Sequence, residues 1–241
     1  MSKSDNENEN EYGGEQLKRG FYGRRAGKGL RGRQAELMDD YSTHPLTLSI
    51  EEPCPQDLTA LFDVPVSSVW LESGFGGGEH LVHRAKENPE TGFIGIEPFR
   101  NGMARALQNI EEEGLQNIRL YNDEGGPFLD WLPASSLSGY YLLYPDPWHK
   151  KRHFKRRFVN KQNLERIERV LIEGAEFRCA SDIDAYVEWT VEHCADNPAF
   201  KWLNGSEEKS LTPWDNWPST RYEAKALREG RIPRYLTFKV N

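Results

Sequence analysis

The glycine-rich stretch SGFGGGEH, residues 73–80, follows a short apolar run and precedes a helix-like segment. Glycines at such a turn remove Cβ atoms and let a ligand approach the backbone closely. Gly74, Gly76 and Gly78 form G-x-G-x-G, whereas the dinucleotide fingerprint G-x-G-x-x-G needs a glycine where Glu79 stands. A carboxylate at the start of the helix would also repel a pyrophosphate. The loop therefore favours a ligand without phosphates over a dinucleotide, although a simple tight turn remains an alternative for the glycines alone.

Carboxylates stand near the ends of three apolar runs. Glu72 precedes the glycines, Glu97 ends GFIGIE, and Asp123 follows NIRLYN. Ligands of open α/β sheets bind at the carboxyl ends of the strands. There, Glu97 can accept hydrogen bonds from both hydroxyls of a ribose, Asp123 is placed to meet an adenine amine, and Glu72 can face a cationic amino-acid tail. Together these acids indicate a cofactor with adenosine, a positive charge and no phosphates, which describes S-adenosylmethionine better than NAD.

The stretch YPDPWHKKRHFKRRF, residues 144–158, places an acid directly before a dense run of cations. Prolines on both sides of Asp146 fix φ and remove backbone donors, which predicts a rigidly held carboxylate. No acid occurs between Pro147 and Leu164, although the whole chain has a formal net charge of −7. Such a run is typical of a phosphate-binding surface. A structural interpretation is that the prolines only end a strand. Trp148 could stack on an extruded base, but packing against the turn is the more common role of such a tryptophan.

The N-terminal residues predict a flexible arm, residues 1–33, that is partly basic. The first sixteen residues are polar and acidic, and we expect neither a signal peptide nor a membrane span. The stretch 18–34 mixes Arg and Lys with Gly and two aromatics, a composition that can order on an anionic partner or stay solvated. Three widely spaced cysteines, and His149 and His153 without metal-ligand spacing, predict no disulfide framework and no metal site. We expect a cytoplasmic protein, either a monomer or a homodimer.

From residue 67 onward, apolar runs alternate with helix-like stretches, the pattern of a parallel sheet with crossover helices. We predict one α/β domain over residues 34–241. The expected strands are 69–73, 92–97, 117–122, 139–144, 176–181, a short one near 200, and 234–240. The last two alternate like strands at a sheet edge, and the final one is expected to be antiparallel. The expected helices are 34–40, 79–87, 101–113, 160–171, 183–195 and a short helix that begins near Thr220, with Thr220 and Glu223 as a capping box.

The stretches LESGFGGGEH, GFIGIEPFRNGMARAL, YYLLYPDPWHKKRHFKRRF and WPSTRYEAKALREGRIPRYLTF resemble the bacterial tRNA (guanine-N7-)-methyltransferase family, TrmB. The resemblance runs in order from about residue 32 to residue 240. PDPWxKxRHxKRR is specific to that family, whereas the glycine loop is common among methyltransferases. The resemblance implies a Rossmann-like class I methyltransferase fold, S-adenosylmethionine as the donor, and methylation of guanine N7 at position 46 in the variable loop of tRNA.

The resemblance also implies roles for particular residues. Its cofactor acids fall on Glu72, Glu97 and Asp123, and its catalytic aspartate, which also borders the cofactor, on Asp146. Its substrate-binding positions fall on Lys150, Arg152, His153, Lys155, Arg156, Arg157, Asp182, Thr220, Arg221, Tyr222 and Glu223. The chain departs from the family pattern at Gly77, where a larger residue is common, and at residues 122–124, where Asn-Asp-Glu replaces a frequent Asp-Ala.

We hypothesise that Asp146 either accepts hydrogen bonds from guanine N1-H and the exocyclic amine or stabilises the positive charge that develops on the purine. Two other functions stay open at this point. A non-catalytic RNA-binding module would need the basic run but not the glycines and strand-end acids. A methyltransferase for another substrate would need the cofactor residues but would leave the basic run unused.

Overall fold

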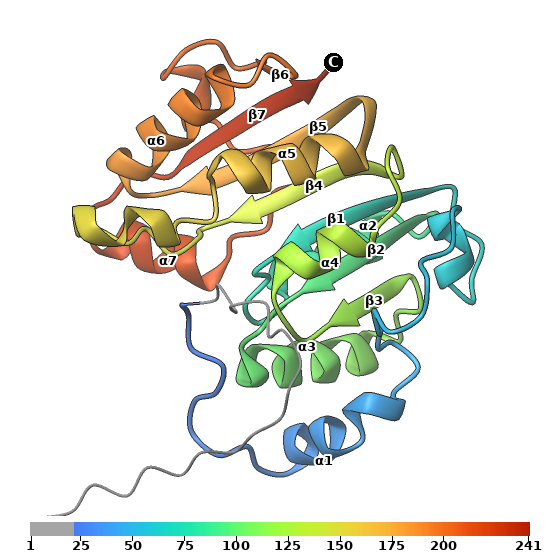
Figure 1. The fold of residues 1–241 in the computed structure, drawn as a ribbon. Helices are drawn as coiled ribbons and strands as arrows, with labels where there is room; N and C mark the ends of the chain where they lie inside the picture. The colour runs from blue at the N-terminus through green and yellow to red at the C-terminus, as the bar shows by residue number, and fades with distance from the viewer. Residues whose placement is uncertain (1–21) are drawn as a thin grey trace, which may run out of the picture.

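The computed structural model describes residues 22–241, so the expectations for residues 1–21 lie outside it. A seven-stranded sheet in the order β3-β2-β1-β4-β5-β7-β6 forms its centre (Figure 1). Every neighbouring pair from β3 to β5 is parallel, and β7 is antiparallel to both of its neighbours. This confirms the predicted α/β class, the mostly parallel sheet of seven strands and the antiparallel last strand. The strands are β1 (Ser68–Ser73), β2 (Thr91–Ile96), β3 (Ile118–Tyr121), β4 (Leu137–Leu143), β5 (Leu171–Ser181), β6 (Phe200–Trp202) and β7 (Arg234–Val240).

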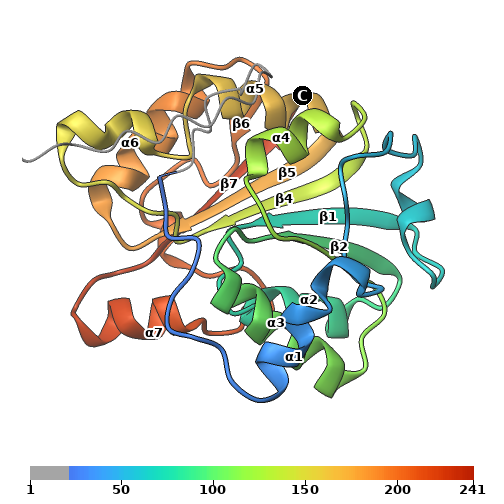
Figure 2. The ribbon, with the colours of Figure 1, turned by 60° about the horizontal axis from the view of Figure 1, so that its bottom comes forward.

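Helices cover both faces of the sheet, as parallel strands require. They are α1 (Arg33–Asp39), α2 (Glu79–Glu87), α3 (Arg100–Glu113), α4 (Gly125–Trp131), α5 (Lys161–Val170), α6 (Asp184–Ala195) and α7 (Arg221–Arg228). Helices α4, α5 and α6 supply buried side chains to one face, and α2 and α3, with α1 packed on α3, supply them to the other. Figure 2 shows α1, α2, α3 and α7 on the opposite side of the strands from α4 and α5.

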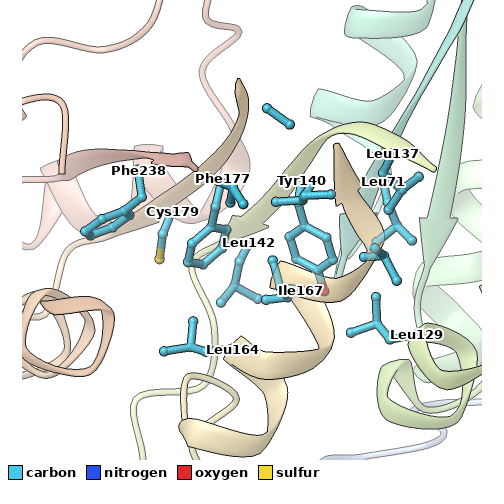
Figure 3. Close-up of a cluster of buried hydrophobic side chains, with 14 of the residues drawn as sticks. Leu71, Leu129, Leu137, Tyr140, Leu142, Leu164, Ile167, Phe177, Cys179 and Phe238 are labelled. Atoms are coloured by element: carbon cyan, nitrogen blue, oxygen red, sulfur yellow. The ribbon is translucent and has the colours of Figure 1, made fainter. Parts of the chain in front are cut away.

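The larger core lies between the central strands and α5. The α5 side chains Leu164 and Ile167 face the strand residues Tyr140, Leu142 and Phe177, and all of them are buried (Figure 3). Because side chains alternate along a strand, the neighbours of Tyr140 and Leu142 point to the opposite face. Tyr141 and Leu143 accordingly belong to a separate cluster there. Burial on both faces explains why residues 139–144 form a nearly continuous apolar run.

Three features differ from the sequence expectations. Strand β7 does not lie at the edge but between β5 and β6, and only one residue of its 234–240 span is exposed. Its apparent alternation was misleading because Thr237, the polar residue in the middle of the strand, is buried and accepts a hydrogen bond from Trp214 Nε1. Helix α4 was not predicted, since its first residues, Gly-Gly-Pro, are poor helix formers. Strand β5 begins at Leu171, five residues before the predicted start.

Before the first strand, the chain packs against the sheet and its helices. Leu37 and Met38 of α1 are buried in the cluster formed with α2 and α3. Thr47 forms an isolated parallel bridge with Leu120 of β3, and the Leu48 N–H donates to the Leu120 carbonyl at 2.8 Å. Within residues 22–241, no helix combines the length and the apolar character needed to cross a bilayer.

Candidate active site

A cavity of about 1720 Å³ opens at the carboxyl ends of β1, β2, β3 and β4. Its wall includes residues from the glycine loop, from the acids that follow the strands, and from the turn at residues 144–148. The glycine loop and the Pro-Asp-Pro-Trp turn therefore lie at the same rim of the sheet. A drug-sized ligand occupies a pocket of about 300–1,000 Å³. The cavity is large enough for two ligands side by side. Of the predicted site residues, it is lined by Gly74, Gly76, Glu97, Asp123, Asp146, Lys155, Arg156, Arg157 and Tyr222.

The glycine loop depends on its glycines for both conformation and space. Gly74, Gly76 and Gly78 have φ values of 71°, 61° and 79°, in the left-handed region that favours glycine. Gly78 caps the N-terminus of α2, and a Cβ there would lie 2.8 Å from that of Ala106. A Cβ on Gly102 of α3 would collide with the carbonyl oxygen of Gly76. Helix α3 therefore holds the loop by direct backbone contact.

Glu97 connects the end of β2 to the glycine loop. Its Oε2 accepts a hydrogen bond from the Gly76 N–H at 2.7 Å, and its Oε1 accepts one from the Phe99 N–H at 2.9 Å. The residue is only 7% exposed. Burial raises the pKa of Glu97 to about 7, against the opposing effect of the two N–H donors, and the charge of Asp146 raises it further. This carboxylate lines the cavity and titrates near neutral pH.

Glu72 is placed differently from the sequence expectation. Its carboxylate Oε2 lies 2.7 Å from Nδ1 of His80, both residues are 3% exposed, and Glu72 does not line the cavity. The His80 ring in turn packs against Tyr141 and Trp217. Alternation along β1 explains the difference, because Ser73 points to the cavity face and Glu72 to the opposite one. The structure thus pairs Glu72 with a histidine outside the cavity lining.

Asp123 lines the cavity beyond β3, as predicted. Its Oδ1 accepts a hydrogen bond from the Glu124 N–H at 2.9 Å and forms an ion pair with Nη1 of Arg25 at 2.7 Å. Arg25 belongs to the basic N-terminal stretch, for which the sequence left open whether it orders on an anionic partner or stays solvated. Within the described chain, that partner is the protein's own acidic pair, Asp123 and Glu124.

Asp146 projects from the turn after β4 into the same cavity. Tyr144 and Trp148, on either side of the Pro-Asp-Pro sequence, have φ values of 50° and 45°. Such values are uncommon for bulky residues and indicate a turn held by its surroundings. Although Asp146 reaches solvent, the surrounding protein raises the pKa of its carboxyl group by desolvation. The turn thus holds a carboxylate on the cavity wall.

Arg157 fixes this turn through hydrogen bonds to backbone carbonyls. Its Nε donates to the Pro147 carbonyl at 2.9 Å, and Nη1 donates to the Ala185 carbonyl at 3.3 Å. The guanidinium lies 3.8 Å from the centre of the Phe154 ring and 4.8 Å from that of Trp189. The residue is 2% exposed, so it differs from the expectation of a cation available to phosphates.

The rest of the basic segment forms a short 3-10 helix, Lys151–Arg156. Lys150, Arg152 and Lys155 are exposed, whereas His153 and Arg156 are half-buried. The Arg156 guanidinium lies 5.0 Å from the centre of the Trp148 ring and 4.6 Å from that of Tyr22. Trp148 therefore packs within the turn, which fits the structural interpretation preferred from the sequence. Lys150, Arg152 and His153 lie outside the cavity lining, on the segment that borders it.

Helix α7 approaches the glycine loop from the other side. Thr220 caps it, with Oγ1 accepting from the Glu223 N–H at 3.2 Å, as predicted. Glu223 does not complete a capping box, because its carboxylate accepts from Trp217 Nε1 at 2.6 Å and from the Tyr235 hydroxyl. The guanidinium of Arg221 lies 3.6 Å from the Glu79 carboxylate. Of the four predicted positions on this helix, only Tyr222 lines the cavity.

Asp182 lies near α7 but does not line the cavity. Its Oδ2 accepts from Nε of Arg231 at 2.5 Å. Sequence reasoning missed several cavity residues, among them Tyr22, Ser73, Glu124 and Arg166. Ser73 was recoverable, since it stands at the end of β1 directly before Gly74. Tyr22 was not, because its place depends on contacts with residues more than a hundred positions away. Within residues 22–241, no group of three or more ligand-type side chains is arranged to hold a metal ion.

Comparison with known proteins links this site to one enzyme family. A family model described as a putative methyltransferase matches residues 67–233. The tRNA (guanine-N(7)-)-methyltransferase of Rhizobium meliloti (strain 1021) is 55% identical over 219 residues, covering 91% of this chain and 94% of that protein. The enzyme of the same name from Brucella anthropi is 54% identical and covers 90% of this chain and 93% of that protein.

Solved structures agree on the fold. The crystal structure of the 16S rRNA methyltransferase KamB superimposes with a TM-score of 0.53 at 17% identity, covering 79% of this chain and 95% of that one. At this identity the likeness concerns the fold alone, and it confirms the predicted Rossmann-like methyltransferase architecture. The family model and the extent of the two sequence matches show that the chain belongs to the tRNA (guanine-N(7)-)-methyltransferase family.

Proposed function

We propose that this protein transfers a methyl group from S-adenosylmethionine to N7 of guanine at position 46, in the variable loop of tRNA. One observation carries the proposal. The glycine loop with Glu97 and the turn with Asp146 line a single cavity that is bordered by the exposed cations of the basic segment. Cofactor, base and phosphate groups can therefore be bound next to one another. The names of the matched relatives supply the substrate class.

The residues at the strand ends fit S-adenosylmethionine. Gly74 and Gly76 leave the loop without side chains where it meets the cavity, so a ligand can touch the backbone. Glu97 would accept hydrogen bonds from the ribose hydroxyls, and Asp123 from the adenine amine. The carboxylates of Glu97, Asp123 and Asp146 give this wall a negative character that favours a cationic ligand. When bound, the donor would supply an electrophilic methyl group attached to a sulfonium sulfur.

Methylation of N7 makes few demands on acid–base groups. Guanine N7 has a free lone pair, so the new N–C bond can form while the S–C bond breaks and its electron pair returns to sulfur. No proton has to be removed first. The protein contributes mainly by orientation, an effect worth at most roughly 7–11 kcal/mol. The proposed catalytic residue, Asp146, faces the purine and stabilises the positive charge that the base acquires.

The exposed cations would bind the tRNA backbone. Lys150, Arg152 and Lys155 project from the segment next to the cavity without an acidic partner at the distances of an ion pair among the described residues. Phosphate contacts of this kind position a nucleic acid and make its binding depend on salt. The guanine could then reach the cavity beside Asp146, while the backbone stays outside.

The proposal is tested by incubating the full-length protein with an unmodified tRNA transcript and methyl-labelled donor. Borohydride and aniline then cleave the RNA only at N7-methylguanosine, and the fragment length identifies the modified position. We expect one cleavage, at position 46. Incorporation of label without aniline cleavage would show that the enzyme methylates another atom of the tRNA. If no label were incorporated, the proposed activity would be refuted.

Asp146→Asn is the matched variant for the proposed catalytic residue, because it keeps the shape of the side chain and removes its charge. We expect a turnover number reduced by about 10² or more, as for the loss of one electrostatic contact to a transition state. Full turnover in the Asn variant would show that the charge of Asp146 is not needed.

A further inference from the structure

Residues 22–28, which we call the strap, pass along the rim of the candidate site. In Figures 1 and 2 the dark blue segment before α1 runs past the arrowhead ends of the central strands. Tyr22, Gly23 and Arg24 line the cavity together with Glu97 and Asp146. The strap is therefore part of the wall of the candidate site, although it lies far from the other lining residues in the sequence.

The backbone of the strap is fixed to the start of α3. The Arg100 N–H donates to the Arg25 carbonyl at 2.8 Å. Asn101 binds the strap twice, since its Oδ1 accepts from the Gly27 N–H at 2.6 Å and its Nδ2 donates to the Lys28 carbonyl at 2.7 Å. A Cβ on Gly27 would already lie 3.0 Å from the Phe99 ring. These contacts place the strap next to the segment that carries Glu97.

The side chain of Arg25 joins the strap to the adenine side of the cavity. Nη1 donates to Asp123 Oδ1 at 2.7 Å, and Nη2 donates to Glu124 Oε1 at 2.6 Å. The Glu124 N–H donates to the same Asp123 oxygen. The hydrogen bonds from Arg25 and from the Glu124 N–H are both accepted by Oδ1 of Asp123. An adenine amine can therefore donate to the other carboxylate oxygen without displacing Arg25. Arg25 fixes the orientation of the carboxylate without occupying all of it.

The other end of the strap reaches the basic segment. The Tyr22 ring lies over the Arg156 guanidinium at 4.6 Å and meets Trp148 edge-on, with ring centres 6.5 Å apart. The strap thus contacts the two halves of the rim, one through Arg25 and the other through Tyr22. A ligand bound between Glu97 and Asp123 would lie behind it.

We infer that the strap is the outer wall of the cofactor site, and that Arg25 is a positioning residue that orients Asp123 and slows departure of the bound nucleoside. The inference rests on the cofactor site proposed above. It assigns a role to a residue that sequence reasoning had left in a flexible arm, and it predicts that losing one exposed side chain weakens binding of the nucleoside.

The test uses S-adenosylhomocysteine, the demethylated product, as the probe. Its affinity is measured by titration calorimetry and its dissociation rate by stopped flow, on the full-length protein and three variants. Arg25→Ala should weaken binding about three- to tenfold, mainly through faster dissociation, as expected for an exposed charge that makes two ion pairs. Arg25→Lys should lie between, because an ammonium lacks the planar geometry needed to reach both carboxylates. Arg31→Ala is the control, since it removes an equal charge from an exposed residue outside the cavity lining.

Tryptic cleavage after Arg24 gives a readout that does not depend on activity. S-adenosylhomocysteine should slow this cleavage in the unmodified chain and protect Arg25→Ala less at the same fractional occupancy. Failure of the unmodified chain to bind the probe would refute the proposed cofactor site itself. Equal or tighter binding by Arg25→Ala, with the unmodified chain binding normally, would overturn the role of the strap and leave the site intact. Thermal melting confirms that each variant is folded.

Discussion

Substitution of Arg157 should separate the positioning of the turn from the binding of phosphates. Arg157 stands within the cationic run, and the sequence predicted a phosphate contact for it. In the structure its Nε donates to the Pro147 carbonyl, one residue after Asp146, while its guanidinium packs against Phe154 and Trp189. A side chain that is buried by these contacts can determine where Asp146 lies.

The expected size of the effect follows from those contacts. A buried carbonyl left without its donor costs about 1–3 kcal/mol. The lost contacts with aromatic rings cost about a further 0.5–2 kcal/mol. Arg157→Ala should therefore lower the free energy of unfolding by about 1.5–5 kcal/mol. If the turn moves by about 1 Å, the rate of methyl transfer should fall by about 10²-fold.

The assay is steady-state kinetics with tRNA and donor varied in turn, at a temperature where thermal melting shows the variant to be folded. Arg157→Ala should lower kcat and leave the KM for tRNA within about twofold, the pattern of an interaction that matters in the transition state. Arg157→Lys should restore part of the activity, because Lys can reach one carbonyl but cannot stack as a planar group. Lys155→Ala, an exposed neighbour, is the control and should raise the KM for tRNA with little change in kcat.

A contrary result would be easy to recognise. An unchanged kcat with a raised KM for tRNA in Arg157→Ala, together with a smaller salt dependence of tRNA binding, would show that Arg157 binds phosphate in solution. It would also show that the turn keeps its geometry without this residue.

Four further predictions concern the cofactor loop and the basic segment. Since burial raises the pKa of Glu97 to about 7, donor affinity should fall as the pH decreases below that value, and Glu97→Gln should flatten the titration. The folded protein should also retain this proton between about pH 4.5 and 7, where the unfolded chain loses it, so the contribution of Glu97 to the free energy of unfolding falls as pH rises through that window. Replacing Lys150, Arg152 and Lys155 by Gln should reduce the slope of log K for tRNA against log salt by about 2–3, which filter binding at several salt concentrations would measure. Gly102→Ala should push a methyl group against the Gly76 carbonyl, cost about 1–3 kcal/mol of stability and weaken donor binding measured by calorimetry, whereas Gly29→Ala, in open space, should change neither.

The sequence was informative where a local pattern determines position. Apolar runs located the central strands, and the rule that parallel strands end at one edge brought Glu97, Asp123 and Asp146 to one cavity. The same rule could not decide which face of a strand a side chain uses. Glu72 is the next-to-last residue of β1 and Glu97 follows β2, but alternation turns Glu72 towards His80.

Long-range packing explains the remaining differences. The burial of Arg157 depends on Trp189, about thirty residues later in α6, and no spacing near residue 157 signals it. Arg25 and Asp123 are separated by 98 positions and pair because the chain before α1 is bound to the start of α3. A run of cations looks uniform in sequence, whereas the fold divides it into exposed residues such as Arg152 and buried ones such as Arg157.

The turn that carries Asp146 is held at both of its uncommon backbone positions. A non-glycine residue in a sparsely populated conformation costs about 1–3 kcal/mol and persists only where its surroundings enforce it. Tyr144 stacks towards Tyr222 of α7, with ring centres 6.5 Å apart, and Trp148 lies against Arg156 and the strap residue Tyr22. Arg157 fixes the carbonyl between them. Three separate parts of the chain therefore enforce one rigid turn, which is what in-line methyl transfer requires, because its rate depends on orientation more than on proton transfer.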